Sequence, residues 1–195
     1  CTSHGITSLA LIADHLVLMA DATYHVYRAY DMLADFIFFL AGAGGTSITF
    51  GDAYTAQYNQ ADGCVGLPSK KLAYCVDSPN YNVHVVQYHN ASCYPEASCW
   101  QNEVTSTMVA GGTAGDADGT GTHAKFTDPM GVAYLDGQVY FASNAALKIK
   151  RMNEVTRQVV TVAGSGTNGA TSHATGTSAN INPFSLAIVK REHLR

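Results

Sequence analysis

Residues 109–133, VAGGTAGDADGTGTHAKFTDPMGVA, decide the fold. This stretch begins at the end of an apolar run, passes through a loop of Gly, Thr and Asp, and enters a second apolar run through the triplet Ala124-Lys125-Phe126. Just beyond it, Asp136-Gly137 separates two apolar runs, which is a strong signal for a β-hairpin. The segment therefore predicts four consecutive short strands, at residues 131–134, 138–142, 147–152 and 158–163.

The same pattern occurs three times along the chain. Each copy has an apolar run ending in Ala-Gly, and 15 to 17 residues after that glycine comes the large apolar residue of a small–any–large triplet. The glycines are Gly42, Gly111 and Gly164, and the triplets are Ala56-Gln57-Tyr58, Ala124-Lys125-Phe126 and Ala179-Asn180-Ile181. A repeat of this kind indicates a repeated structural unit.

The other copies also divide into four short strands each. We expect strands at 6–12, 16–20, 25–30 and 36–40 in the first copy, and at 64–67, 71–76, 83–88 and 106–110 in the second. A fourth copy begins with a strand at 184–189. Four strands per repeat is the rhythm of a β-propeller blade, so the fold class is all-β. One region, 1–195, holds modules at about 5–42, 63–111 and 131–164 and a partial one at 183–190.

The repeat resembles the NHL family of β-propellers. The motif Ala-Gly … Asp-Gly … Ala-x-Phe-x-x-Pro-x-Gly-Val-Ala is matched by residues 110–133, and the second strand ends in the NHL manner at Met19-Ala20-Asp21 and Cys75-Val76-Asp77. Ser185 stands where the family usually has Gly. Because NHL propellers usually close with five or six blades, the resemblance implies that further chain, another copy or an assembly covers the open edges of three modules.

Composition excludes several function classes. Charged residues make up 13% of the chain and the formal net charge is −4, which gives no basic surface for nucleic acid and argues against the RNA-binding members of the family. The longest apolar stretches, 9–20 and 36–43, are shorter than the roughly 18 residues that a membrane-spanning helix needs.

Four clustered cysteines indicate a disulfide framework. Cys64, Cys75, Cys93 and Cys99 are separated by 11, 18 and 6 residues, which does not match the paired spacing of zinc sites. Cys64 and Cys75 lie on neighbouring predicted strands and are within pairing reach if they face each other, while Cys93 and Cys99 are placed to close a loop. The sequon at Asn90 predicts N-glycosylation, and together these features favour an oxidising, extracellular or cell-surface location.

Two loop motifs have a ligand-binding form. Residues 164–169 satisfy G-x-G-x-x-G, but the next residues are poor helix formers, so we expect no dinucleotide site. Asp116 and Asp118 resemble the start of a calcium loop, but Thr127 stands where the bidentate Glu would be, and turn formation explains the Asp-Gly pair without a metal.

Two histidines raise the possibility of an enzyme. His25 and His84 are predicted at matching positions of two third strands, where a propeller brings equivalent residues around one axis, but Lys148 at that position in the third copy breaks the set. Zinc bound by histidines is known in an NHL-like lyase that cleaves peptidyl-α-hydroxyglycine. The simpler interpretation is that both histidines are solvated strand residues. We therefore expect no catalytic residue, no metal and no cofactor.

These observations predict an extracellular glycoprotein that acts as an interaction and structural module. Its partners are expected to be another protein or further copies of itself, with glycans attached covalently and no membrane span. Secreted NHL propellers occur in cell-surface fibres, including mastigoneme-like flagellar filaments, so a fibre subunit is one such role. The alternative is a metal-dependent lyase of the peptidyl-α-hydroxyglycine amidating type.

Overall fold

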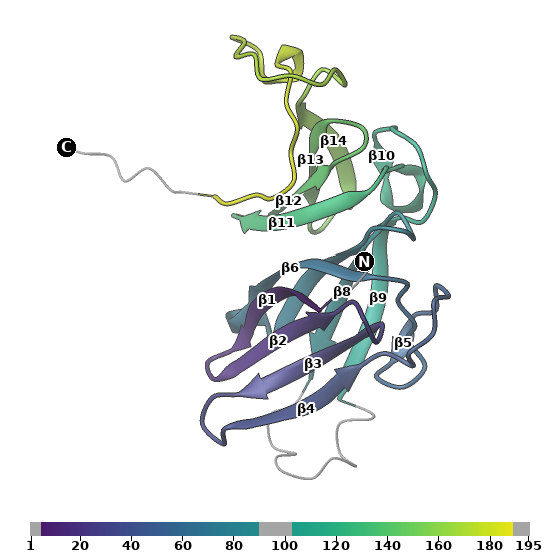
Figure 1. Ribbon diagram of the computed structural model, residues 1–195, viewed down its shortest axis with the longest axis vertical. Helices are drawn as coiled ribbons and strands as arrows, with labels where there is room; N and C mark the ends of the chain where they lie inside the picture. The colour runs from purple at the N-terminus through teal and green to yellow at the C-terminus, as the bar shows by residue number, and fades with distance from the viewer. Residues whose placement is uncertain (1–4, 90–102, 189–195) are drawn as a thin grey trace, which may run out of the picture.

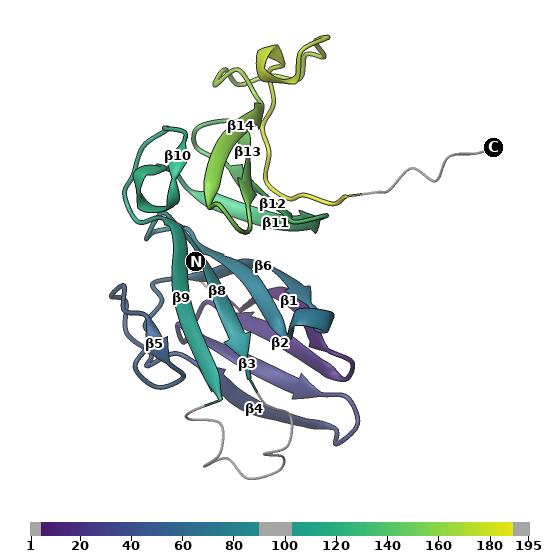
Figure 2. The same ribbon diagram turned by 180° about the vertical axis from the view of Figure 1, so that it is seen from behind.

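The computed structural model describes residues 5–89 and 103–188, which form three antiparallel sheets (Figures 1 and 2). The first sheet, the first blade, has the order β1-β2-β3-β4, with β1 (Ile6–Ala13), β2 (Leu16–Asp21), β3 (Val26–Asp31) and β4 (Phe36–Ala41). The second blade has the order β6-β7-β8-β9-β5, with β6 (Ala61–Leu67), β7 (Leu72–Asp77), β8 (Asn82–Tyr88), β9 (Val104–Gly111) and β5 (Gly51–Asp52). The third blade has the order β11-β12-β13-β14-β10, with β11 (Pro129–Leu135), β12 (Gln138–Ser143), β13 (Lys148–Asn153), β14 (Gln158–Ala163) and β10 (Gly119–Thr120). The predicted all-β fold built from four-stranded antiparallel blades is confirmed.

In residues 5–89 and 103–188 the helical content is restricted to single turns. These are the 3₁₀ helices η1 (Pro68–Lys70), η3 (Gly121–His123) and η4 (Gly176–Ser178). Within the described parts of the chain, no helix has the length and apolarity required to cross a bilayer.

The tight turns follow from local residue chemistry. Asp136 and Gly137 both adopt positive φ, 46° and 79°, which is the type I′ geometry that matches the twist of a hairpin. Elsewhere an Asp or Asn side chain at the end of a strand accepts the backbone N–H groups of the turn that follows. Asp31 accepts from Leu33 and Ala34 in this way, and Asn153 from Val155 and Thr156.

The recurrent glycine is required by a close backbone approach. Gly111 has φ +87°, and a Cβ placed on it would lie 2.2 Å from the carbonyl oxygen of Tyr81. Gly164 has φ +94° and meets the carbonyl of Leu147 at the same 2.2 Å. Tyr81 and Leu147 are themselves left-handed residues directly before the third strand of their blades. The end of the outer strand therefore packs against the left-handed bend that precedes the third strand. Only glycine fits there, which explains the Ala-Gly repeat.

The loop between blades joins each blade to the next. After leaving the first blade, the chain forms β5, which pairs with the outer strand β9 of the second blade, and β10 pairs with β14 of the third in the same way. The triplet residues Ala56, Tyr58, Ala124 and Phe126 at the end of these loops are fully buried. Each loop therefore supplies both an edge strand and a core residue to the blade that follows it.

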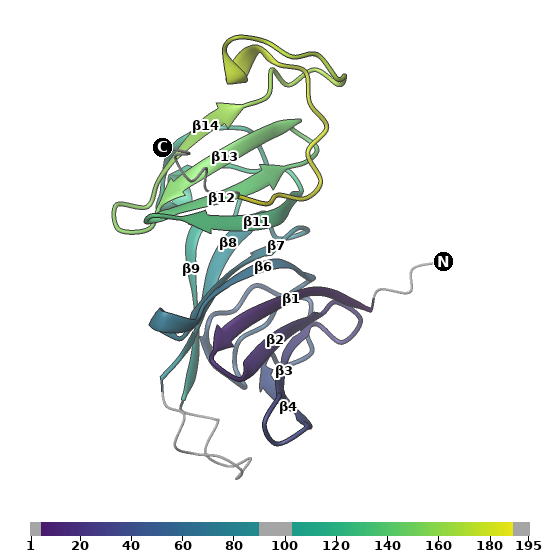
Figure 3. The same cartoon turned by 90° about the vertical axis from the view of Figure 1, so that its left-hand side faces the viewer.

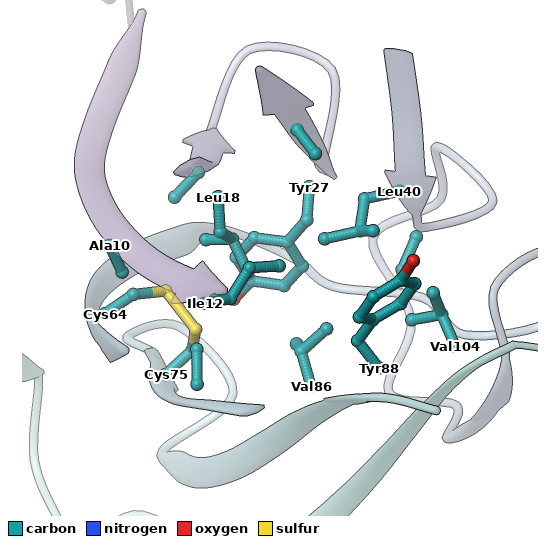
Figure 4. Close-up of a cluster of buried hydrophobic side chains, with 14 of the residues drawn as sticks. Ala10, Ile12, Leu18, Tyr27, Leu40, Cys64, Cys75, Val86, Tyr88 and Val104 are labelled. Carbon is teal, nitrogen blue, oxygen red and sulfur yellow. A yellow bond between two sulfur atoms is a disulfide. The ribbon is translucent and has the colours of Figure 1, made fainter. Parts of the chain in front are cut away.

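Apolar side chains fill the spaces between successive blades. One cluster lies between the first and second blades and includes Leu18, Tyr27, Leu40, Val86 and Tyr88 (Figure 4). A second cluster lies between the second and third blades, where Phe126 and Phe141 make an edge-to-face contact with ring centroids 4.7 Å apart. The innermost strands β1, β6 and β11 follow one another from blade to blade (Figure 3).

The predicted fourth-copy strand at 184–189 is not formed in the described residues. Residues 181–188 have no strand, although the chain near Ser185 passes beside Gly131 of β11, where a Cβ would lie 2.6 Å from the Ser185 Cα. In each blade the innermost strand is hydrogen-bonded by the second strand of the same sheet. No such partner follows Phe184 among the described residues, so this segment stays extended without a ladder.

Candidate functional site

A pocket of about 490 Å³ lies at the inner edges of the blades. It is lined mainly by two consecutive positions of the repeat. They are the last two positions of the Pro-x-Gly motif, whose glycine is Gly131 in the third blade and is called the motif glycine below. These residues are Thr7 and Ser8, Asp62 and Gly63, Met130 and Gly131, and Phe184 and Ser185. The pocket is therefore a product of the repeat, because each innermost strand presents the same two positions to it.

Close backbone packing of the innermost strands sets the floor of this pocket. A Cβ on Gly63 would lie 3.0 Å from the backbone N of Gly131, and a Cβ on Gly66 would lie 1.8 Å from the carbonyl oxygen of Leu11. Two hydroxyls join the first blade to the second: Thr7 Oγ1 donates to the Ala61 carbonyl at 2.6 Å, and Ser8 Oγ accepts the N–H of Cys64 at 2.9 Å. The walls are held by backbone contact and by these hydrogen bonds.

Asp62 is the ionisable residue of the pocket lining. Its side chain accepts from Gln60 Nε2 at 2.9 Å and from the backbone N–H of Ser78 at 3.3 Å. The residue is only 6% exposed, and this burial raises the pKa of Asp62 to about 6, with smaller contributions from the nearby carboxylates of Asp77 and Asp128. The carboxyl is therefore ionised at pH 7 without a basic side chain bonded to it among the described residues.

The remaining wall of the pocket is apolar and carries the disulfide. Met130, Val132 and Phe184 contribute apolar surface, and Cys64 lies in the lining. Cys64 and Cys75 are directly opposite on β6 and β7, with Cα atoms 4.2 Å apart, and their sulfurs are bonded (Figure 4). The two cysteines therefore meet the condition set for their pairing, which is that they face each other. Asn90, Cys93 and Cys99 lie outside the described residues.

The predicted correspondence of His25 and His84 is wrong. His25 is a left-handed turn residue before β3, and its Nδ1 contacts the Asn59 carbonyl, while His84 is the third residue of β8. The strand registers pair Met19 with Arg28, Cys75 with His84 and Phe141 with Lys150, so the residues that match His84 are Arg28 and Lys150. The sequence comparison placed His25 in the strand, three residues out of phase.

His84 has a structural role between the first two blades. It is fully buried, with Nδ1 donating to Asn82 Oδ1 at 2.9 Å and Nε2 2.8 Å from the Tyr27 hydroxyl, and its ring stacks on Tyr58. Burial lowers the pKa of His84 to about 3, so the ring is neutral across the physiological range. Both ring nitrogens are used for contacts within the core, which leaves neither directed to a metal.

The carboxylates of the calcium-like loop are bound to lysines. Lys150 Nζ lies 2.9 Å from Asp116 Oδ1 and 2.9 Å from Asp118 Oδ1, and Lys148 bonds the second oxygen of Asp116. Lys150 is fully buried, so these ion pairs neutralise a charge inside the space between the second and third blades. Residues 164–169, with their nucleotide-like glycines, continue into a loop and not into a helix.

Comparison with known proteins supports the fold. No family model matches the chain. In sequence it is 26% identical over 189 residues to the Arabidopsis thaliana Protein SUPPRESSOR OF QUENCHING 1, chloroplastic. The matched region covers 91% of this chain and 17% of that relative.

Two solved structures that resemble the chain come from Bacteroides species. An auxiliary nutrient binding protein from Bacteroides ovatus matches with a TM-score of 0.67 and 14% identity, over 96% of this chain and 44% of that one. A protein of unknown function from Bacteroides thetaiotaomicron matches with a TM-score of 0.65 and 15% identity, over 92% of this chain and 41% of that one. The chain thus has a propeller-type β fold and spans less than half the length of each of these three proteins.

Proposed function

We propose that the chain is part of an NHL-type propeller that acts outside the cell as a protein-interaction and structural module. In this proposal the blades are a rigid scaffold, the open blade faces bind further blades of the same kind, and the loops contact other proteins. The observation that carries it concerns Arg28, His84 and Lys150, which occupy the same position in the three blades. The preceding blade covers His84 and Lys150, whereas the blade face that holds Arg28 is open.

Each of these residues belongs to a row that crosses one face of its blade. The rows are Leu9–Met19–Arg28–Phe39 in the first blade, Cys64–Cys75–His84–Met108 in the second and Val132–Phe141–Lys150–Thr161 in the third. The preceding blade covers the second and third rows, where His84 and Lys150 are fully buried. The equivalent row of the first blade therefore lies on the face that a preceding blade would cover.

That face of the first blade is apolar and open. Leu9 is 64% exposed, and the neighbouring row Leu11–Val17–Tyr30–Ile37 adds Leu11 at 42% and Ile37 at 53%. Adjacent exposed apolar residues on one sheet face mark a surface that binds protein. Arg28 in the middle of this face is held by Asp21 at 2.9 Å, so the polar position is already paired and does not oppose burial.

The size of the isolated chain tests this surface. We expect the 195-residue chain to sediment as a dimer or larger species at tens of micromolar, with Leu11→Glu shifting it towards the 20.7 kDa monomer. Val155→Glu is the matched control, because Val155 is 81% exposed in the turn between β13 and β14, away from the face. A monodisperse wild-type monomer would contradict the proposal.

The extracellular location rests on separate chemistry. The bonded Cys64–Cys75 pair and the sequon at Asn90 are both compatible with an oxidising secretory route. Intact mass of the native protein, before and after reduction and glycosidase treatment, tests it. We expect added mass at Asn90 and no free thiol among the four clustered cysteines, whereas an unmodified chain with reactive thiols would place the protein inside the cell.

A further inference from the structure

We propose that the pocket at the inner edges of the blades binds a small organic cation, a primary ammonium attached to an apolar group. Asp62 is the charged anchor, and the surface of Met130, Val132 and Phe184 receives the apolar part. This inference is independent of the open face of the first blade.

The first argument is the incomplete satisfaction of the Asp62 carboxylate. A carboxylate has about four acceptor positions, and Asp62 uses two of them, both with neutral donors. Asp21 and Asp116, in contrast, are each bonded to a cation, Arg28 and Lys150 respectively. Asp62 has none among the described residues and lines a pocket large enough to admit one.

The second argument is the sign of the surrounding charge. The charged groups that act on Asp62 are the carboxylates of Asp77 on β7 and Asp128 before β11, and both disfavour a second negative charge. Their own partners are neutral: Asp77 accepts the N–H groups of Asn59 and Gln60, and Asp128 accepts the hydroxyl of Ser78. No basic side chain of the described residues forms an ion pair with these three carboxylates, so a cation is attracted to the region and an anionic ligand is repelled.

The third argument is the match between an ammonium and the other polar atoms of the lining. An ammonium has three donors and no acceptor, and the oxygens of Thr7 and Ser185 can accept from it as well as the carboxylate. The lining holds a single carboxylate, and no group of three or more His, Cys, Asp or Glu side chains that could hold a metal ion occurs among the described residues. The aromatic ring of Phe184, 67% exposed, offers both apolar contact and an attractive face for a cation.

Benzylamine is a suitable probe, with benzyl alcohol and benzoate as isosteric neutral and anionic controls. We expect benzylamine to bind the wild-type chain at pH 7.5, followed by chemical shifts of the pocket residues, at least about tenfold more tightly than either control. Asp62→Asn should remove this preference. Asp14→Asn, which removes an exposed carboxylate at the far end of β1, should retain it.

A pH series on the wild-type protein keeps the test valid if Asp62→Asn does not fold. Benzylamine stays protonated between pH 5 and 7.5, so its affinity should level off above about pH 7 and fall by about tenfold between pH 7 and pH 5, as Asp62 takes up a proton. The proposal is overturned if benzyl alcohol binds as tightly as benzylamine, or if the affinity does not depend on pH in this range.

Discussion

Replacing Gly111 by Ala should strongly destabilise the protein, because two separate costs meet at this residue. Its φ of +87° lies in the left-handed region, which costs an L-residue about 1–2 kcal/mol. The added methyl would also lie 2.2 Å from the Tyr81 carbonyl oxygen and 2.6 Å from Phe126 Cε2. These contacts would force the outer strand β9 away from Tyr81 and from the ring of Phe126. Overpacking of this kind costs about 1–3 kcal/mol, so we expect a total loss of about 2–5 kcal/mol.

Gly137→Ala separates the two costs. Gly137 has a similar φ of +79°, but its Cβ would meet no atom closer than 3.9 Å, so only the backbone cost of about 1–2 kcal/mol applies. Both free energies of unfolding are measured by equilibrium urea denaturation followed by circular dichroism at 25 °C. If Gly111→Ala is no more destabilising than Gly137→Ala, the repeated glycine is not explained by the close approach of the backbone, and the reasoning fails.

Three further predictions follow from buried groups, and all are read from urea unfolding. Lys150→Ala should cost about 2 kcal/mol, because it leaves two carboxylates without their buried cation. Lys148→Ala removes the more exposed ammonium of the same strand and should cost less than about 1 kcal/mol; equal effects would contradict the assigned roles. Replacing both Cys64 and Cys75 by Ala should cost about 3 kcal/mol, the loop entropy of an 11-residue separation, and the same loss should appear on adding reductant to the wild type but not to the variant. The pKa of Asp62 rises on folding, so this residue should add stability as the pH falls from 6 to 4. The pKa of His84 drops on folding, so this residue should remove stability as the pH falls from about 6.5 to 3. On acidification, His84→Gln should therefore become more stable relative to the wild type and Asp62→Asn less stable, and parallel pH curves for the two variants would refute both assignments.

The sequence was sufficient for the blades because its strongest signals are backbone requirements. The Ala-Gly pairs and the Asp136-Gly137 turn each report a conformation that few residues can adopt, so they fix strand ends and their phase. That phase placed Cys64 and Cys75 on neighbouring strands, and the register of β6 and β7 sets them directly opposite each other. The short strands β5 and β10 were missed, since two residues in a Gly- and Asp-containing loop carry no alternating pattern.

The side-chain chemistry was harder to predict than the strands. His25 was counted as a strand residue because no glycine marks the bend before β3. The corresponding bends of the three blades are occupied by His25, Tyr81 and Leu147, which have no residue type in common. The pocket was missed for another reason: its residues Thr7, Asp62, Met130 and Phe184 are chemically different, and only their shared place before the motif glycine connects them. An alignment of the copies on that glycine would have found it.

The pairing of β5 with β9 and of β10 with β14 has a consequence for how such a chain can grow. The second sheet is assembled from residues 51–111 and the third from residues 119–163, so the structural unit starts inside the loop that follows the previous outer strand. A gene duplication or an engineered insertion that copies a sheet from its innermost strand would leave the new outer strand without its edge partner. The portable segment begins about ten residues earlier, and a recombination break tolerated by this architecture is expected just after Gly42 or Gly111 and not at the first residue of β6 or β11.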